Sequence, residues 1–162
     1  MSRRLLHAAC AVLGIVVLAA CAASTRPAPD ETWFRERVAR TYVEPFRRGD
    51  VETWLEVFAE DAVALHNRRP ADVGKAAIRA FGLAVHEHFN IERFDVNVRE
   101  VRSSGDWVLT RGDFVSRFTL KADGSSPWGE EEGKFVLLWE RQDDGVWRIL
   151  VDMGNSSRSG GD

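Results

Sequence analysis

The sequence has few of the residues that support the commonest kinds of enzyme chemistry. Its 162 residues include two cysteines, two methionines and a single tyrosine. It holds no HExxH motif, no glycine-rich phosphate loop and no serine at a nucleophile elbow. His86 and His88 are two positions apart, so on a helix they point in different directions and do not form a metal site. We therefore expect no metal, no other cofactor and no acyl-enzyme chemistry.

The charge balance argues against another class of partner. Lysine and arginine together number 22 and aspartate and glutamate 25, which gives a formal net charge of −3. A domain that binds nucleic acid usually carries a clear excess of positive charge. No nucleic acid partner is therefore expected, and the length suits one domain with a hydrophobic core.

The first twenty residues form a separate segment. Arg3 and Arg4 precede an apolar run from Ala8 to Ala20, which ends in Leu-Ala-Ala and is followed by Cys21. A positive start, an apolar run and small residues before a cysteine are typical of a lipoprotein signal peptide. An ordinary secretory signal and an uncleaved membrane helix are the alternatives, although the run is short for a span. We predict a lipoprotein signal peptide at residues 1–20.

Cys21 is then the predicted lipid anchor to a membrane. Removal of residues 1–20 takes two of the 22 basic residues, leaving 20 against 25 acidic ones, and it leaves no second cysteine for a disulfide. Residues 21–30 are small, polar and proline-bearing, which predicts a flexible tether. By resemblance to bacterial lipoproteins, the alanine after Cys21 favours the outer membrane, with the protein facing the periplasm.

Three amphipathic helices are predicted in the first half of the domain. The first runs from about Glu31 to Arg48, with a kink at Pro45, and ends at Gly49, while Asp50 caps the next helix. Apolar residues recur every four positions along the first helix: Phe34, Val38, Tyr42 and Phe46. The second helix has one apolar face: Val51, Trp54, Leu55 and Phe58.

A short strand and a third helix follow. The strand is predicted at Ala62–His66, and Gly74 begins the third helix. One face of that helix is apolar: Ile78, Phe81 and Val85.

From Phe89 onward the apolar period changes to two, which predicts a meander of antiparallel strands. A change of phase at Arg99-Glu100 indicates a bulge, and Gly112 allows a close approach by a neighbouring segment. Residues 121–133 are predicted as a loop, and their acidic run Glu130–Glu132 is interpreted as solvated. Trp107 and Trp147 are expected to fill the core. One face of the strand that contains Gly112 is of mixed character and is either solvated or a dimer contact: Leu109, Arg111, Asp113, Val115 and Arg117.

Several short sequence segments together resemble the nuclear transport factor 2-like superfamily, in its SnoaL-like and ketosteroid-isomerase-like branches. They are the helix end at Gly49-Asp50, the segment of residues 57–63, Gly74 with Ile78, and the segment of residues 144–149. The resemblance covers residues 33–157. It implies an α+β fold, in which a cone-shaped curved antiparallel β-sheet wraps around three N-terminal helices and leaves an apolar pocket. We assign residues 31–157 to this domain and residues 158–162 to a disordered tail. The resemblance also implies a homodimer through the sheet face.

Two residues are predicted to be catalytic. Tyr42 falls where a ketosteroid-isomerase-like enzyme carries the tyrosine that donates to a developing oxyanion, so the resemblance implies that role. The alternative is a core tyrosine bonded to a backbone carbonyl. His66 falls at the position of the carboxylate that moves a proton between carbons, and an imidazole titrates near neutral pH. Alternatively, His66 caps its strand or points to water.

This sequence departs from the pattern of such enzymes at the second oxyanion donor. In such enzymes this donor is a protonated carboxylic acid on a late strand, and its position falls at Leu137 here. Loss of one donor costs a few kcal/mol of transition-state stabilisation. Asp152 and Asn155 fall where relatives place polar groups near the pocket mouth, although the end of the chain in solvent explains them equally well. Aromatic and apolar residues are predicted to line the pocket: Trp54, Phe81, Leu137 and Trp139, with Tyr42.

Three functions stay open. The first is a lipid-anchored periplasmic protein that binds a small apolar or aromatic molecule in the conical pocket. The second is a proton-transfer enzyme of isomerase, dehydratase or cyclase type, with His66 as base and Tyr42 as electrophile. The third is a non-catalytic envelope assembly subunit that uses its sheet face. The fold alone does not choose among them, because this scaffold hosts many functions.

Overall fold

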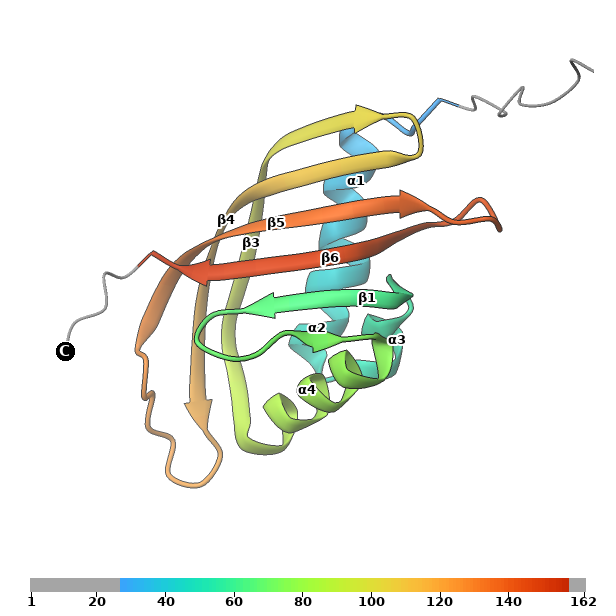
Figure 1. The fold of residues 1–162 in the computed structure, drawn as a ribbon. Coiled ribbons are helices and arrows are strands. Elements are labelled where there is room, and N and C mark those ends of the chain that lie inside the picture. Colours follow the sequence, from blue (N-terminus) through green and yellow to red (C-terminus); the bar gives the residue numbers. More distant parts are fainter. Residues whose placement is uncertain (1–26, 158–162) are drawn as a thin grey trace, which may run out of the picture.

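The computed structural model describes residues 27–157 of the chain, which form helices packed on one face of a curved sheet (Figure 1). The predicted signal peptide, Cys21, most of the predicted tether and the tail at residues 158–162 lie outside the described residues. No helix within the described part is long and apolar enough to cross a membrane. The elements are α1 (Glu31–Arg37), η1 (Val38–Val43), α2 (Glu44–Arg48), α3 (Val51–Leu55), β1 (Phe58–His66), β2 (Asp72–Val73), α4 (Lys75–His88), β3 (Phe89–Ser104), β4 (Trp107–Leu120), β5 (Glu130–Arg141) and β6 (Trp147–Ser156).

The first predicted helix is continuous through α1, η1 and α2, with a π-helical segment in its middle. Asp30 caps its start, because the Asp30 Oδ1 accepts a hydrogen bond of 2.8 Å from the backbone N–H of Trp33. The π-helical segment ends just before Pro45, which has no N–H to continue the regular pattern. At the other end Gly49 takes the left-handed conformation, with φ of 77°, and the Asp50 carboxylate accepts from the backbone N–H of Thr53. The predicted helix end and cap are confirmed.

The sheet has six strands in the order β2-β1-β6-β5-β4-β3. Strands β3 to β6 form the predicted antiparallel meander, whereas β1 pairs with β6 in parallel. The helices lie against one face of the sheet, which curls around them without closing (Figure 1). The predicted α+β cone is confirmed. The parallel β1–β6 pair is the one exception to its antiparallel pairing.

A bulge bends the long β3–β4 ribbon. Val98 pairs with Gly112 and Glu100 with Arg111, so Arg99 is the extra residue, as the change of phase predicted. Gly112 is needed at this place, because a Cβ there would lie 1.9 Å from the carbonyl oxygen of Asn97. The close approach predicted at Gly112 is therefore confirmed.

Helices and strands meet in one core. Its largest fully buried side chains come from the first helix, from α3, from α4 and from the inner face of the sheet: Phe34, Trp54, Phe58, Ile78, Leu137, Trp139 and Ile149. Three expectations from the sequence are corrected. Phe58 begins β1 instead of continuing the second helix, because α3 ends at Leu55. Trp107 is 41% exposed, whereas Trp147 is in the core as expected. The acidic run Glu130–Glu132 begins strand β5 instead of lying in a loop.

Candidate functional site

A cavity of about 200 Å³ lies between the helices and the inner face of the sheet. Most of its wall is apolar, and eight of its lining residues are aromatic, so we call it the aromatic cavity. These eight are Tyr42, Phe46, Trp54, Phe81, Phe94, Phe114, Phe118 and Phe135. The polar lining residues are His66, Asn67, Ser116, Glu131, Asp152, Asn155 and Ser156. A mainly apolar concave wall with a few converging polar groups is the usual form of a small-molecule site.

Six of the residues predicted from the sequence lie together on this wall: Tyr42, Trp54, His66, Phe81, Asp152 and Asn155. The other two do not. Leu137 and Trp139 are fully buried in the core and are not part of the lining. Trp139 lies under the first helix, where its ring centroid is 5.7 Å from that of Phe34 and its indole N–H donates to Thr110. The prediction that Leu137 and Trp139 line the pocket is therefore wrong.

The Tyr42 hydroxyl donates a hydrogen bond of 2.8 Å to Oδ2 of Asp152. The acceptor is therefore a carboxyl oxygen, and not the backbone carbonyl that the alternative interpretation of Tyr42 predicted. The Asp152 side chain is buried, and burial raises the pKa of its carboxyl from 3.8 to about 6, although the hydrogen bond from Tyr42 lowers it in part. Burial, together with the negative charge of Asp152, raises the pKa of Tyr42 well above its ordinary value. Asp152 can therefore gain or lose a proton near neutral pH while Tyr42 stays a donor.

The strand register explains how the acid reaches this place. Asp152 pairs with Ala64 of β1 on one side and with Leu137 of β5 on the other. In the enzymes that the sequence resembles, a carboxylic acid occupies the position of Leu137. The structure instead has an acid directly beside Leu137, on the neighbouring strand.

His66 is the last residue of β1 and lies on the same wall. Its ring stacks on Phe81, with centroids 4.0 Å apart, and its Nε2 is 3.7 Å from Oδ2 of Asp72. Arg69 holds the other oxygen of Asp72 at 2.8 Å. Both Nε2 and Oδ2 are buried without a hydrogen-bond partner, so a small shift would join them.

The charge state of His66 follows from this environment. Burial lowers the pKa of His66, the negative charge of Asp72 opposes that effect, and the positive charge of Arg69 adds to it. His66 is therefore a neutral imidazole at neutral pH. It pairs with Gly154, two residues along β6 from Asp152, so His66 and Asp152 are offset by about 7 Å along the strand direction. The structure thus places Tyr42, His66 and Asp152 around one cavity, while their chemical roles stay predictions.

Two acidic side chains at this site were not predicted from the sequence. Glu131 lines the cavity, because β5 begins earlier than expected and the alternation that places Phe135 inward continues back through Gly133 to Glu131. Asp72 was missed as the partner of His66, and the two-residue strand β2 that carries it left no periodic signal. Within residues 27–157 no three His, Cys, Asp or Glu side chains are grouped closely enough to hold a metal ion.

A second hollow, of about 620 Å³, lies beside the first helix and the β5–β6 turn. Its charged lining is largely paired already: Arg148 binds Asp144 at 2.8 Å and Lys75 binds Glu60 at 3.0 Å. Such exposed ion pairs are common on protein surfaces and indicate no ligand. The aromatic cavity is therefore the candidate site.

Comparison with known structures places the fold among nuclear transport factor 2-like proteins. A ketosteroid isomerase-like protein from Erwinia carotovora atroseptica SCRI1043 is 24% identical, with a TM-score of 0.70 over 80% of this chain and 98% of that chain. A nuclear transport factor 2-like superfamily protein from Salmonella enterica serovar Typhimurium LT2 is 13% identical, with a TM-score of 0.68 over 80% of this chain and 92% of that chain. A nuclear transport factor 2-like protein from Pseudomonas putida KT2440 is 19% identical, with a TM-score of 0.62 over 77% of this chain and 84% of that chain. At these identities the likeness shows the fold alone.

Sequence comparison gives the family. No curated protein matches the chain significantly. The sequence model of the SnoaL-like domain matches residues 39–149, which include every helix from α2 to α4 and strands β1 to β5. The chain is therefore a member of the SnoaL-like domain family.

Proposed function

We propose that the aromatic cavity binds a small, largely apolar molecule that carries one polar group. One observation supports this proposal above all: a wall of eight aromatic residues surrounds a cavity into which a hydrogen-bonded Tyr42–Asp152 pair faces. Apolar surface of the ligand would leave water on binding, at about 25 cal/mol for each Å² buried. The polar pair would fix the orientation of the ligand.

The volume bears on the size of the ligand. A cavity of about 200 Å³ has room for a single-ring compound. The aromatic rings favour a flat or aromatic body, because offset and edge-on ring contacts add to the stabilisation that burial alone provides.

Binding is tested by calorimetric titration of the purified protein with a panel of single-ring aromatic alcohols, amines and ketones. We expect at least one to bind to the wild-type protein. Val96→Trp fills the cavity and should abolish that binding, since Val96 is a lining residue. Val146→Trp is the matched control, because Val146 is 40% exposed in the β5–β6 turn, away from the cavity. The absence of any binding, or equal binding by both variants, would contradict the proposal.

A second candidate function is proton transfer, which the properties of the Asp152 carboxyl favour. A buried carboxyl with a pKa of about 6 suits a general acid or base near neutral pH. Asp152 would move the proton, and Tyr42 would turn its O–H from Asp152 to the substrate oxygen on which charge develops. His66, predicted from the sequence as the base, would act as the acceptor on the other side of the substrate.

Proton transfer has a test that needs no known substrate. The protein is incubated in D₂O with single-ring ketones, and the loss of their α-hydrogen signals is followed by NMR. Catalysis predicts exchange by the wild-type protein and loss of exchange in Asp152→Asn, while ketone binding persists. If the wild-type protein binds the ketones without exchange, the site is one for binding only.

Lipid anchoring through Cys21 and an outer-membrane location are also part of the proposal. They are supported by the lipoprotein pattern that precedes Cys21. Cys21→Ser should abolish incorporation of labelled palmitate and move the protein from the membrane to the soluble fraction. Equal labelling of this variant and the wild-type protein would contradict the anchor.

A further inference from the structure

The acidic and basic side chains that line the aromatic cavity carry charge of only one sign. Its lining contains two carboxylic acids, Asp152 and Glu131, and among the described residues no lysine or arginine contributes to it. The remaining titratable side chains facing Asp152 are Tyr42 from the first helix and His66 from β1. Neither is charged at neutral pH, because burial lowers the pKa of His66, which keeps the imidazole neutral, and raises that of Tyr42, which keeps the phenol protonated and neutral. The cavity therefore presents negative charge and no protein cation to balance it.

Asp152 lacks a counter-charge in particular. Its only hydrogen bond within the described part of the chain comes from Tyr42 and reaches Oδ2, which leaves Oδ1 available to accept a further hydrogen bond. No cationic side chain lies near enough to lower the pKa of this carboxyl. Buried charges in proteins are normally paired, because an isolated ion loses much of its hydration energy. A ligand with a positive charge would supply the missing partner.

The rings beside the acid suit a cation as well. The ring centroid of Tyr42 lies 6.1 Å from that of Trp54 and 6.2 Å from that of Phe94, so an aromatic wall begins where the acid is. Phe46 closes this wall, at 4.9 Å from Trp54 and 5.4 Å from Phe94. The faces of aromatic rings attract ammonium groups, most strongly where water is excluded. The same rings would bury the apolar body of the ligand.

We propose that the natural ligand of the aromatic cavity is a protonated organic amine, whose ammonium group pairs with Asp152 and whose apolar body lies against the aromatic rings. This inference rests on the proposed function and narrows it to one class of compound. A neutral alcohol or ketone would use the Tyr42–Asp152 pair but would leave the negative charge unbalanced. A carboxylate or phosphate would meet two acids and no cation.

Glu131 has a separate part in this arrangement. It lies six residues from Leu137 along β5, and Leu137 pairs with Asp152, so the two acids are separated by roughly 20 Å along the sheet. One ammonium group therefore cannot contact both. Glu131 instead adds negative potential at the far end of the cavity, which draws cations toward it.

The test compares three probes with the same ring and different charge: 2-phenylethylamine, 2-phenylethanol and 3-phenylpropionate. Affinities for the purified protein are measured by calorimetry at about pH 5 and about pH 8, on either side of the Asp152 pKa of about 6. At the higher pH we expect the amine to bind about tenfold or more tightly than the alcohol, the equivalent of one modest charge pair. At the lower pH Asp152 is protonated, so the ratio should fall toward one. The acid should bind most weakly at the higher pH.

Variants separate the charge of Asp152 from the fold. Asp152→Asn keeps the shape of the side chain and should remove the preference for the amine over the alcohol at both pH values. Asp113→Asn is the matched control, because it removes one negative charge on the outer face of the sheet, where Asp113 binds Arg99 at 2.6 Å. Asp113→Asn should keep the preference for the amine over the alcohol.

The outcomes are distinguishable. If the alcohol binds as tightly as the amine at about pH 8, or the preference survives in Asp152→Asn, the amine inference is overturned and the proposed binding function stands. If none of the three probes binds while other single-ring compounds do, the inference is likewise overturned. If nothing binds, the proposed function fails with it. The comparison of wild-type protein at two pH values needs no variant to fold.

Discussion

The Tyr42 hydroxyl donates a hydrogen bond of 2.8 Å to the Asp152 carboxyl, and this bond joins residues 110 positions apart in the chain. The donor is in the π-helical middle of the first helix and the acceptor on the last strand. π-Helical turns are frequent at functional sites, where they change the direction in which a side chain points. The bond stabilises the charged form of an acid that burial otherwise destabilises, so it sets the proton affinity of the cavity.

Removal of the hydroxyl should raise the pKa of Asp152 further. In Tyr42→Phe the carboxyl loses the one hydrogen bond that lowers its pKa, while burial still raises it, so the pKa should exceed its present value of about 6. The measurement is a ¹³C NMR titration of the side-chain carboxyl. Thr119→Val is the control, since it also removes a hydroxyl, one that bonds Glu92 away from the cavity, and should leave the pKa of Asp152 in place. An unchanged or lower pKa in Tyr42→Phe would contradict the assignment.

Asp152 should make the protein less stable as pH rises toward neutrality. Its pKa is 3.8 in the unfolded chain and about 6 in the folded one, so between these values the folded state holds the proton more tightly. The free energy of unfolding therefore falls through this window, by about 1.4 kcal/mol for each of roughly two pKa units, or on the order of 3 kcal/mol. The penalty is absent below pH 3.8 and complete above about pH 6.

Urea unfolding at several pH values measures this effect. Asp152→Asn cannot ionise, so its stability should lack this fall between the two pKa values and should exceed that of the wild-type protein at neutral pH. Asp113→Asn, which removes an exposed carboxyl paired with Arg99, should retain the fall. Identical pH profiles for Asp152→Asn and the wild-type protein would show that Asp152 is not the group responsible.

Local pattern was enough to predict most of the fold. The stripe of apolar residues predicted the first helix, and Gly49 and Asp50 predicted its end and the start of the next, because capping depends on neighbours in sequence. The change to a period of two predicted the meander, and the change of phase at Arg99 predicted the bulge. Each of these features is decided within a few residues.

The site depends on contacts that leave no such pattern. Nothing near Asp152 in sequence shows that β6 pairs with β1 in parallel, and that pairing is what places the acid beneath Tyr42. Alternation correctly put Leu137 and Trp139 on the inner face, yet it could not tell which part of that face the first helix covers. Whether a residue of the inner face lies in the core or lines the cavity depends on what packs against it in the fold, and not on its residue type.

Asp72 and Arg69 should shift the pKa of His66 in opposite directions. The negative charge of Asp72 raises it and the positive charge of Arg69 lowers it. Asp72→Asn should therefore lower the His66 pKa, and Arg69→Gln should raise it. NMR titration of the His66 ring protons measures both. General loosening of the β1–β2 turn would expose His66 and raise the pKa in both variants, so opposite shifts identify the charges as the cause.

Gly112 should tolerate no side chain. A Cβ there would lie 1.9 Å from the Asn97 carbonyl oxygen, a backbone atom that cannot turn aside, so Gly112→Ala should cost about 3 kcal/mol of stability. Gly154→Ala is the control, because its Cβ would meet nothing nearer than Phe114 Cε1 at 3.9 Å, and its change should stay within about 1 kcal/mol. Thermal unfolding of both variants tests the bulge geometry. Equal costs would show that the strands can separate at Gly112.

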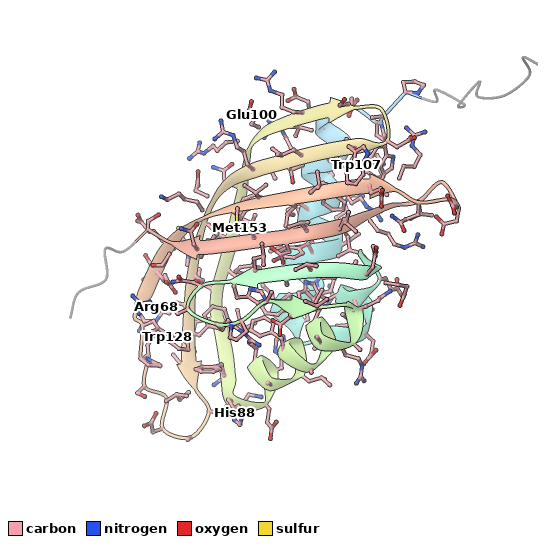
Figure 2. All side chains as sticks on the ribbon, viewed as in Figure 1. Arg68, His88, Glu100, Trp107, Trp128 and Met153 are labelled. Carbon is pink, nitrogen blue, oxygen red and sulfur yellow. The ribbon has the colours of Figure 1, made fainter. Side chains whose placement is uncertain are left out.

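The outer face of the sheet should mediate self-association. Met153 pairs with Leu65 on one side and Val136 on the other, and Val151 pairs with Val63 and Leu138, so apolar side chains continue across three strands. Met153 lies on the face turned away from the helices (Figure 2), and it is 42% exposed. A contiguous apolar patch of this kind usually marks a contact surface. We therefore expect a homodimer, as the resemblance implied.

Sedimentation velocity over a range of concentrations tests this dimer. Met153→Lys places a charge in the centre of the patch, where burial in a dimer would cost several kcal/mol, so it should shift the protein to monomer. Val146→Lys is the matched control, because Val146 is equally exposed, at 40%, but lies in the β5–β6 turn outside the patch, and it should leave the dimer intact. Monomeric wild-type protein at all concentrations, or dissociation by both variants, would exclude this face as the interface between two copies. Loss of the dimer in Met153→Lys alone would assign the interface to the sheet, which leaves the aromatic cavity on the opposite face free to admit its ligand.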